Sequence, residues 1–212
     1  MISLLLLLVI LVVLVIVLSL AWRFASRRYP LPCPVWMKWM LDPPSGHVSA
    51  RTTKTIGLLD LRPGMSVLDA GCGPGRLTIP LAERAGPGGT VTAMDLQEGM
   101  LREVEKRAQK AGLTNIRYLR AGIGEGKLGP GQFDRSVLIT VIGEIPDREA
   151  ALRELFAAMK PGGVLLVEET IRDPHFQTRA KVTQLATAAG FVEKEFTGGR
   201  FSYAMTWEKP GG

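Results

Sequence analysis

Two acidic residues, Asp69 and Asp95, lie on either side of a glycine cluster formed by Gly71, Gly73 and Gly75. The apolar residues before the cluster predict a buried parallel strand that ends in a tight turn, and a helix is expected after it. Glycine permits a positive φ, and because it has no Cβ it lets a ligand approach the main chain closely. Such a strand–turn–helix unit presents backbone N–H groups at the carboxyl end of a sheet, where α/β folds bind cofactors.

The spacing of the cluster, together with the two acids, narrows the kind of ligand. It reads Gly-x-Gly-x-Gly rather than the Gly-x-Gly-x-x-Gly of dinucleotide sites. A carboxylate at Asp69 that faced the turn would repel a pyrophosphate and would suit a cationic ammonium group. Asp95 ends the next predicted strand, residues 90–95, where an acid can accept hydrogen bonds from both hydroxyls of a ribose. The alternative is a packing turn followed by a chance acid.

Four stretches of the sequence carry a resemblance to a known family: VLDAGCGPG, VTAMDLQEGML, FDRSVLITVIGEIPD and MKPGGVLLVEE. Over roughly residues 48–209 the chain resembles the class I S-adenosylmethionine-dependent methyltransferases, most closely the ubiquinone and menaquinone biosynthesis type of C-methyltransferase. The resemblance implies an α/β fold with a doubly wound, mostly parallel seven-stranded sheet and a C-terminal antiparallel hairpin. It also implies that S-adenosylmethionine is the cofactor.

The resemblance further implies which residues contact this cofactor. They follow the carboxyl ends of the predicted strands: Asp69, Gly71, Cys72, Gly73, Gly75, Asp95, Leu96, Gly122, Ile123 and Thr140. In methyltransferases of this kind the third strand usually ends with an acid near the adenine amino group. Here that place reads Ala-Gly-Ile-Gly-Glu over residues 121–125, so the acid is absent and Glu125 is the candidate substitute.

Methyl transfer from a sulfonium mainly requires that two reactants are aligned and water is excluded, and it needs a base only when the acceptor must lose a proton. The first candidate base is Glu144, which follows the predicted fourth strand at residues 133–140. The others are His47, before the first domain helix, and His175, on the loop after the fifth strand. Each histidine could equally be a solvated loop residue, and Glu144 could cap a helix or pair with an arginine. Tyr203 could line the pocket or belong to the core.

The N-terminal segment is apolar and uncharged from residue 4 to residue 22, and Arg23, Arg27 and Arg28 follow it. This length approaches the roughly 20 residues that cross a hydrocarbon core of about 30 Å. We therefore predict a single transmembrane helix at residues 1–22, with the N-terminus outside and the catalytic domain cytoplasmic by the positive-inside rule. A cleavable signal peptide is the alternative, although its basic start, short apolar core and small-residue cleavage site are poorly matched.

Between this segment and a methyltransferase domain at residues 48–212 lies a basic linker rich in proline and tryptophan, residues 23–47. Residues 35–41 predict a short helix with Trp36 and Trp39 on one face. That face suits a membrane interface, a lid over an apolar acceptor pocket, or ordinary packing on the domain.

Composition limits the partners that the chain can have. The 212 residues are enough for one domain with a core, and a net charge of +6 with interspersed acids argues against a dedicated nucleic-acid surface. Cys33 and Cys72 are the only cysteines, so we expect no disulfide framework. No Cys/His cluster has metal-ligand spacing, and we expect no metal site.

The predicted anchor is the main indication of substrate, because holding a domain at a bilayer raises its concentration near lipid-soluble acceptors. The sequence thus predicts a membrane-anchored methyltransferase whose acceptor is an apolar small molecule or lipid: a quinone precursor, a lipid or a hydrophobic thiol. A non-catalytic membrane scaffold of the same fold is one alternative. A nicotinamide-dependent oxidoreductase is the other.

Overall fold

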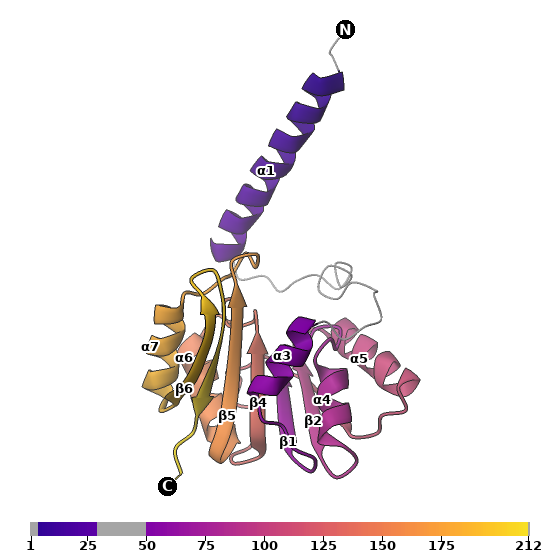
Figure 1. The fold of residues 1–212 in the computed structure, drawn as a ribbon, viewed down its shortest axis with the longest axis vertical. Helices are drawn as coiled ribbons and strands as arrows, with labels where there is room; N and C mark the ends of the chain where they lie inside the picture. The colour runs from indigo at the N-terminus through magenta and orange to yellow at the C-terminus, as the bar shows by residue number, and fades with distance from the viewer. Residues whose placement is uncertain (1–3, 29–49, 212) are drawn as a thin grey trace.

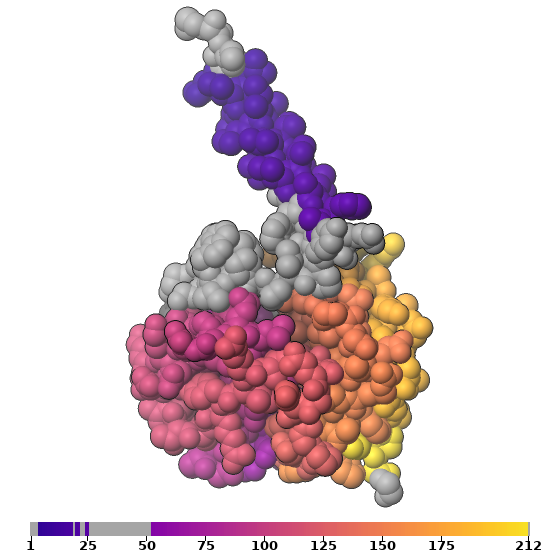
Figure 2. All heavy atoms as spheres, turned by 180° about the vertical axis from the view of Figure 1, so that it is seen from behind, coloured from indigo at the N-terminus to yellow at the C-terminus, as the bar shows by residue number. Residues whose placement is uncertain are grey.

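The computed structural model describes residues 4–28 and 50–211 (Figure 1). His47 and the helix predicted at residues 35–41 lie outside these residues. Helix α1 (Leu4–Arg28) contains the predicted apolar segment, and its side chains from Leu4 to Leu18 are all exposed. In the space-filling view its described atoms form a column that extends away from the domain (Figure 2).

The described residues contain no helix that has both the length and the hydropathy needed to cross a membrane. The predicted transmembrane helix at residues 1–22 is therefore not confirmed.

A seven-stranded sheet forms the centre of the domain. Its strands are β1 (Ser66–Ala70), β2 (Thr90–Asp95), β3 (Ile116–Arg120), β4 (Phe133–Ile139), β5 (Met159–Thr170), β6 (Val192–Gly199) and β7 (Ser202–Glu208). Their order in the sheet is β3-β2-β1-β4-β5-β7-β6. Strands β1 to β5 pair in parallel, whereas β7 runs antiparallel to both β5 and β6. This confirms the predicted mostly parallel sheet with a C-terminal antiparallel hairpin.

Helices cover both faces of the sheet, as predicted (Figure 1). They are α3 (Ala50–Leu58), α4 (Thr78–Ala85), α5 (Glu98–Lys110), α6 (Arg148–Ala158) and α7 (Arg179–Ala189). Their ends follow the local sequence. The Asp147 side chain accepts a hydrogen bond from the Ala150 N–H at the start of α6, and Gly190 ends α7 with a φ of 106°.

Alternate residues of β1 enter the cores on the two sides of the sheet. Val67 packs in one cluster with Leu81 and other residues of α4, whereas Leu68 packs in another with Leu152 and Leu155 of α6. All five side chains are fully buried, and each stabilises the fold by about 2 kcal/mol of apolar transfer free energy. With both faces covered, the carboxyl ends of the parallel strands form the edge where a ligand can bind.

Strand β5 begins earlier than the sequence predicts. The Lys-Pro-Gly-Gly sequence at residues 160–163 is typical of a turn that precedes a strand, but β5 starts at Met159. The reason is pairing with the C-terminal segment: the Gly162 N–H donates to the Lys209 carbonyl at 2.8 Å, and the Lys209 N–H donates to the Gly163 carbonyl at 2.9 Å.

Candidate active site

The glycine turn after β1 is a backbone cradle. Its glycines all adopt the left-handed region, with φ of 75°, 52° and 91° at Gly71, Gly73 and Gly75. A Cβ on Gly71 would lie 2.5 Å from Cγ2 of Val141, so the turn packs directly against the loop after β4. The turn therefore needs glycine both for its conformation and for its fit against this neighbouring loop.

Asp95 connects this turn to the end of β2. Its Oδ2 accepts the Gly73 N–H at 3.0 Å, and its Oδ1 accepts the Gln97 N–H at 2.8 Å. Burial raises the pKa of the Asp95 carboxyl, while both N–H groups oppose that change. Beside it, Leu96 is 51% exposed although it is large and apolar. A half-buried carboxylate next to an open apolar side chain fits a ribose whose base rests on the leucine.

Asp69 lies inside the domain, beneath the turn. Its carboxylate is almost fully buried, and its Oδ2 accepts the Thr78 hydroxyl at 2.6 Å. Burial raises the pKa of Asp69 to about 6, against the effect of that hydrogen bond. The structure thus gives Asp69 a role in joining β1 to α4, and its predicted contact with an ammonium group stays a prediction. Cys72 is also buried, and burial raises the pKa of its thiol strongly, so the thiol stays protonated.

The region after β3 brings Glu125 back towards the expected adenine site. A Cβ on Gly122 would lie 2.6 Å from Oε1 of Glu125 and 3.2 Å from Cδ2 of Leu96. Glu125 is exposed and reaches the position where the third-strand acid is missing. Ile123 packs against the main core cluster. These positions agree with the predicted substitution of Glu125 for the missing acid, which stays a prediction.

Thr140, the remaining predicted cofactor residue, directly follows β4 and has a strained conformation. Its φ is 55°, which is uncommon for a β-branched residue. Its N–H donates to the Glu168 carbonyl at 2.8 Å, and its hydroxyl donates to the Ile139 carbonyl at 2.7 Å. The main chain turns sharply there, and this turn directs the following loop, which carries Glu144, across the edge of the sheet.

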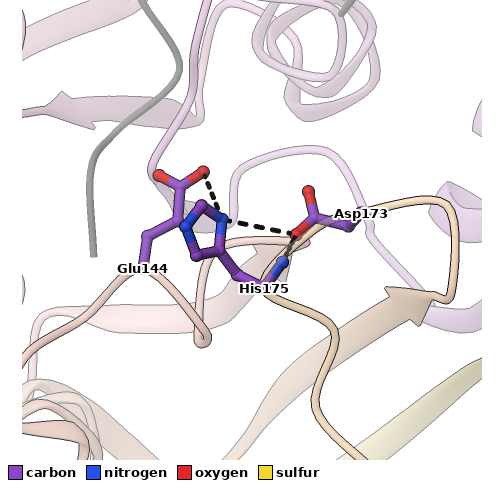
Figure 3. Close-up of side chains that lie close together, drawn as sticks. All are labelled: Glu144, Asp173 and His175. Atoms are coloured by element: carbon purple, nitrogen blue, oxygen red, sulfur yellow. Dashed lines mark hydrogen bonds and ion pairs between the residues drawn. The ribbon is translucent and has the colours of Figure 1, made fainter. Parts of the chain in front are cut away.

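Two of the three predicted bases come together. His175 Nδ1 lies 3.7 Å from Oε1 of Glu144 and 3.6 Å from Oδ1 of Asp173 (Figure 3). The His175 side chain is only 6% exposed, while both carboxylates remain partly accessible. Glu144 follows β4 and the other two residues follow β5, so the cluster forms because the carboxyl ends of these adjacent parallel strands coincide.

Burial gives this cluster its acid–base properties. It raises the pKa of Glu144 from 4.5 to about 7, with the charge of His175 opposing the change and the charges of Asp173 and Asp95 reinforcing it. Because Asp95 belongs to the cofactor side, the two sides share one electrostatic environment. A carboxyl with a pKa near 7 can accept a proton at neutral pH and release it again.

Hydrogen bonds to the main chain hold both loops of the cluster in place. Arg148 donates through Nε to the Ile142 carbonyl at 2.9 Å and through Nη2 to the Gly143 carbonyl at 2.8 Å, which fixes the loop before Glu144. On the other loop, Gln177 donates through Nε2 to the His175 carbonyl at 2.7 Å. Arg148 therefore binds main-chain oxygens and does not pair with Glu144 in the way considered as an alternative.

Sequence reasoning missed Asp173 and Glu169. Glu169 is 1% exposed, and its Oε2 accepts the Gln177 N–H at 2.9 Å. Burial raises the pKa of Glu169 to about 8, so this carboxyl carries a proton at neutral pH. The detectable signals were two acids, Glu168 and Glu169, at the end of an apolar run and the Asp-Pro-His sequence that follows.

Tyr203 belongs to the core rather than to the pocket wall. It is 2% exposed and lies in the larger core cluster, and its hydroxyl donates to the Gln177 carbonyl at 2.8 Å. Burial raises the pKa of its phenol above its usual value, with a further contribution from the charge of Glu169. The core alternative for Tyr203 is the one that the structure favours.

The Glu144, Asp173 and His175 side chains have a donor set that could also hold a cation. Their ligand atoms lie within 4.8 Å of one another. Among the described residues, these three form the group of His, Cys, Asp or Glu side chains that is close enough to hold a metal ion. Sequence spacing gave no sign of it, because the three residues follow two different strands. The expectation of no metal site stays a prediction.

Comparison with known proteins agrees with this geometry. Residues 67–163 match a family model described as a methyltransferase domain. The chain shares its fold with a solved S-adenosylmethionine-dependent methyltransferase from Aquifex aeolicus. The two structures superimpose with a TM-score of 0.74 at 22% identity, over 82% of this chain and 98% of that one. Residues 67–163 are thus similar to a methyltransferase domain.

The chain is also similar to curated proteins that are named methyltransferases. The demethylmenaquinone methyltransferase of Listeria welshimeri is 32% identical over 124 residues, covering 58% of this chain and 52% of that protein. The nocamycin O-methyltransferase of Saccharothrix syringae is 36% identical over 111 residues, covering 52% and 39%. The chain thus spans about half the length of the curated relatives that it matches. The cyclase SpnF shares the fold, with a TM-score of 0.68 at 17% identity over 76% of this chain and 80% of that one.

Proposed function

We propose that this chain transfers a methyl group from S-adenosylmethionine to an apolar acceptor that must lose a proton. The observation that supports this most is the position of Glu144 and His175, two buried or half-buried groups in contact at the same edge of the sheet as the glycine cradle. The family match supports the cofactor. The acid–base cluster supports an acceptor that is less reactive until it is deprotonated.

In this proposal the donor binds along the cofactor side of the sheet edge, beside the glycine turn and the end of β2. Asp95 accepts hydrogen bonds from the ribose hydroxyls, the turn from Gly71 to Gly75 lies along the amino-acid tail, and Leu96 and Glu125 contact the adenine. The bound cofactor supplies a methyl group already activated by a sulfonium. The protein then has to align the acceptor in line with that methyl group and exclude water.

Glu144 takes the proton from the acceptor. As the acceptor atom forms a bond to the methyl carbon, the bond from that carbon to sulfur breaks, and the acceptor proton passes to the Glu144 carboxylate. His175 stabilises the carboxylate charge beforehand, and Asp173, whose Oδ1 lies 3.6 Å from the same Nδ1 atom, helps to orient the imidazole. The raised pKa of Glu144, about 7, makes it a stronger base than an ordinary glutamate while a large fraction is still ionised at neutral pH.

We further propose that α1 holds the domain at a lipid bilayer, with the N-terminus outside and the domain cytoplasmic. The support is the continuous exposure of large apolar side chains from Leu4 to Leu18, which would be costly in water. The arginines that follow in the sequence favour this orientation. An anchored domain would meet acceptors dissolved in the bilayer, and a quinone precursor is the acceptor that the Listeria relative's name suggests.

The test of the transfer reaction uses the full chain in vesicles with methyl-labelled S-adenosylmethionine. We expect label to appear in an apolar quinol, and we expect a long-chain quinol to be methylated faster than a short-chain soluble counterpart. A hydrophobic thiol and a phospholipid serve as competing acceptors. Transfer to none of these acceptors, despite S-adenosylhomocysteine binding, would favour the non-catalytic scaffold.

The anchor is tested separately by placing charges within α1. The double variant Leu11→Arg/Leu14→Arg should stay in the supernatant when vesicles are sedimented, because a charged residue within the bilayer costs about 3 kcal/mol. The matched control Leu11→Val/Leu14→Val keeps the helix apolar and should sediment as the wild type does. Equal sedimentation of both variants would contradict the anchor and leave the transfer reaction unaffected.

A further inference from the structure

Two loops meet at the outer part of the carboxyl edge, at some distance along the sheet from the glycine cradle. The Ile171 N–H, just after β5, donates to the Phe201 carbonyl at 2.7 Å, at the tip of the β6–β7 hairpin. The register continues below this bond, with Thr170 opposite Ser202. This hydrogen bond joins the tip of the hairpin to the end of β5, so the two loops lie side by side.

This surface exposes apolar and cationic side chains together. Ile171 is 38% exposed and Phe201 is 57% exposed. Arg172 and Arg200 flank them and are also exposed, and the Arg200 guanidinium lies 5.5 Å from the centre of the Phe201 ring. We call these four residues the tip patch. Adjacent large apolar side chains in water mark an interaction surface, whereas single ones are ordinary.

The position of the tip patch relates it to the acceptor site. Arg172 is followed directly by Asp173, and the same loop continues to His175 of the acid–base cluster. The ends of β5 and of the β6–β7 hairpin also lie on the side of the domain towards α1 (Figure 1). The patch, the acceptor cluster and the exposed apolar helix therefore share one side of the molecule.

We propose that the tip patch docks on a bilayer containing anionic phospholipids, with Phe201 and Ile171 in the interface and the two arginines on headgroup phosphates. Aromatic and aliphatic side chains flanked by arginine are the combination that binds such interfaces. This docking rests on the proposed membrane function, since it determines how a domain tethered by α1 is oriented. It turns the acceptor cluster towards the lipid, so that an apolar acceptor enters without crossing water.

The experiment places a fluorophore at one of two ends of the same hairpin in the full chain. Ser202→Cys lies beside the patch, and Val192→Cys lies at the opposite end of the hairpin, where Val192 is also 57% exposed. Both are made in a Cys33→Ser background, since Cys72 is buried. The probe is a polarity-sensitive dye, and the vesicles contain phosphatidylcholine with phosphatidylglycerol, with or without brominated acyl chains as quenchers.

We expect brominated lipid to quench the dye at position 202 roughly twofold or more while the dye at 192 stays unquenched, because an interfacial side chain enters the bilayer by several ångströms. The charge reversal Arg172→Glu/Arg200→Glu should abolish the quenching at 202. A control reversal of exposed lysines on α5, Lys106→Glu/Lys110→Glu, makes the same change in net charge and should leave the quenching unchanged.

Sedimentation of the same samples separates the two proposals. Protein that sediments with vesicles but shows equal quenching at both positions would overturn the docking of the tip patch and leave the anchor standing. Protein that does not sediment would overturn both. Quenching at 202 that survives the arginine reversal would also overturn the role given to anionic headgroups.

Discussion

The cofactor side and the acceptor side of this site are constructed from different parts of the chain. The cofactor side consists largely of main chain: glycines with positive φ, and N–H groups bound to Asp95. The acceptor side consists of the buried or half-buried side chains of Glu144, His175 and Asp173, which come from two loops. A binding site made of main chain should lose cofactor affinity when a side-chain atom is added to it. A buried cluster of ionisable side chains should instead change its protonation, and therefore its activity, with pH.

The largest effect on cofactor binding and on stability should come from adding a single methyl group to the cradle. Gly71→Ala places a Cβ 2.5 Å from Cγ2 of Val141 and requires a φ of 75°. We expect the affinity for S-adenosylhomocysteine to fall by about 100-fold and the free energy of unfolding to fall by about 2–4 kcal/mol. Calorimetric titration and denaturant unfolding measure the two quantities.

Gly64→Ala is the matched control for this steric effect. Gly64 has a φ of 87° but no atom within 4 Å of its added Cβ. It should lose about 1 kcal/mol of stability from strain and keep its affinity for S-adenosylhomocysteine. Equal loss of affinity in the two variants would mean that the contact with Val141 does not shape the cradle.

The acceptor side should make turnover depend on pH. Glu144 acts when it is deprotonated, and its pKa is about 7, so turnover should fall roughly tenfold for each pH unit below that value. A rate profile from pH 5 to pH 9 at saturating S-adenosylmethionine measures this. A flat profile between pH 5 and pH 7 would remove Glu144 from the reaction.

Glu169 should make stability depend on pH in the opposite direction to an ordinary carboxylate. Its pKa is raised from 4.5 to about 8, so its contribution is fully present below pH 4.5 and is lost as the pH rises through 8. Glu169→Gln should therefore raise the free energy of unfolding at pH 8 by about 1 kcal/mol or more relative to wild type and reduce its decline with pH. Urea unfolding of the wild type and of the variant at pH 5 and pH 8 measures this difference. If the free energy of unfolding declines equally in both proteins between these pH values, Glu169 does not have the raised pKa.

Chelation should have the smallest effect. A sulfonium donor needs no metal to activate its methyl group, so turnover should be the same before and after dialysis against EDTA. Loss of turnover that manganese or zinc restores would instead identify the cluster around His175 as a metal site. The measurement thus decides whether Glu144, Asp173 and His175 act as an acid–base cluster or as the ligands of a metal ion.

The contrast between the two sides also explains what the sequence could predict. The turn at residues 71–75 and the acid at Asp95 lie within one strand–helix–strand unit, so their spacing is fixed locally and could be read directly. The sheet and its antiparallel end were implied by the family resemblance, and the observed strand order agrees with it.

The acceptor side could be predicted only in part, because it depends on which strands are neighbours. Glu144 and His175 were candidates because each follows a strand, yet their contact requires β4 and β5 to pair in register. Burial, which moves the pKa of Glu169 and places Asp69 beneath the turn, is a property of the packed domain. The residues next to one another in the sequence therefore do not show which side chains are buried.

The central claim is that Glu144 takes the acceptor proton next to a cofactor held by the main chain, and Glu144→Gln tests it most directly. Single-turnover transfer of labelled methyl from S-adenosylmethionine to an apolar quinol should slow by about 100-fold or more, because the amide cannot accept the proton, while the affinity for S-adenosylhomocysteine stays unchanged. Transfer at the wild-type rate, or loss of cofactor affinity equal to the loss of rate, would contradict the account.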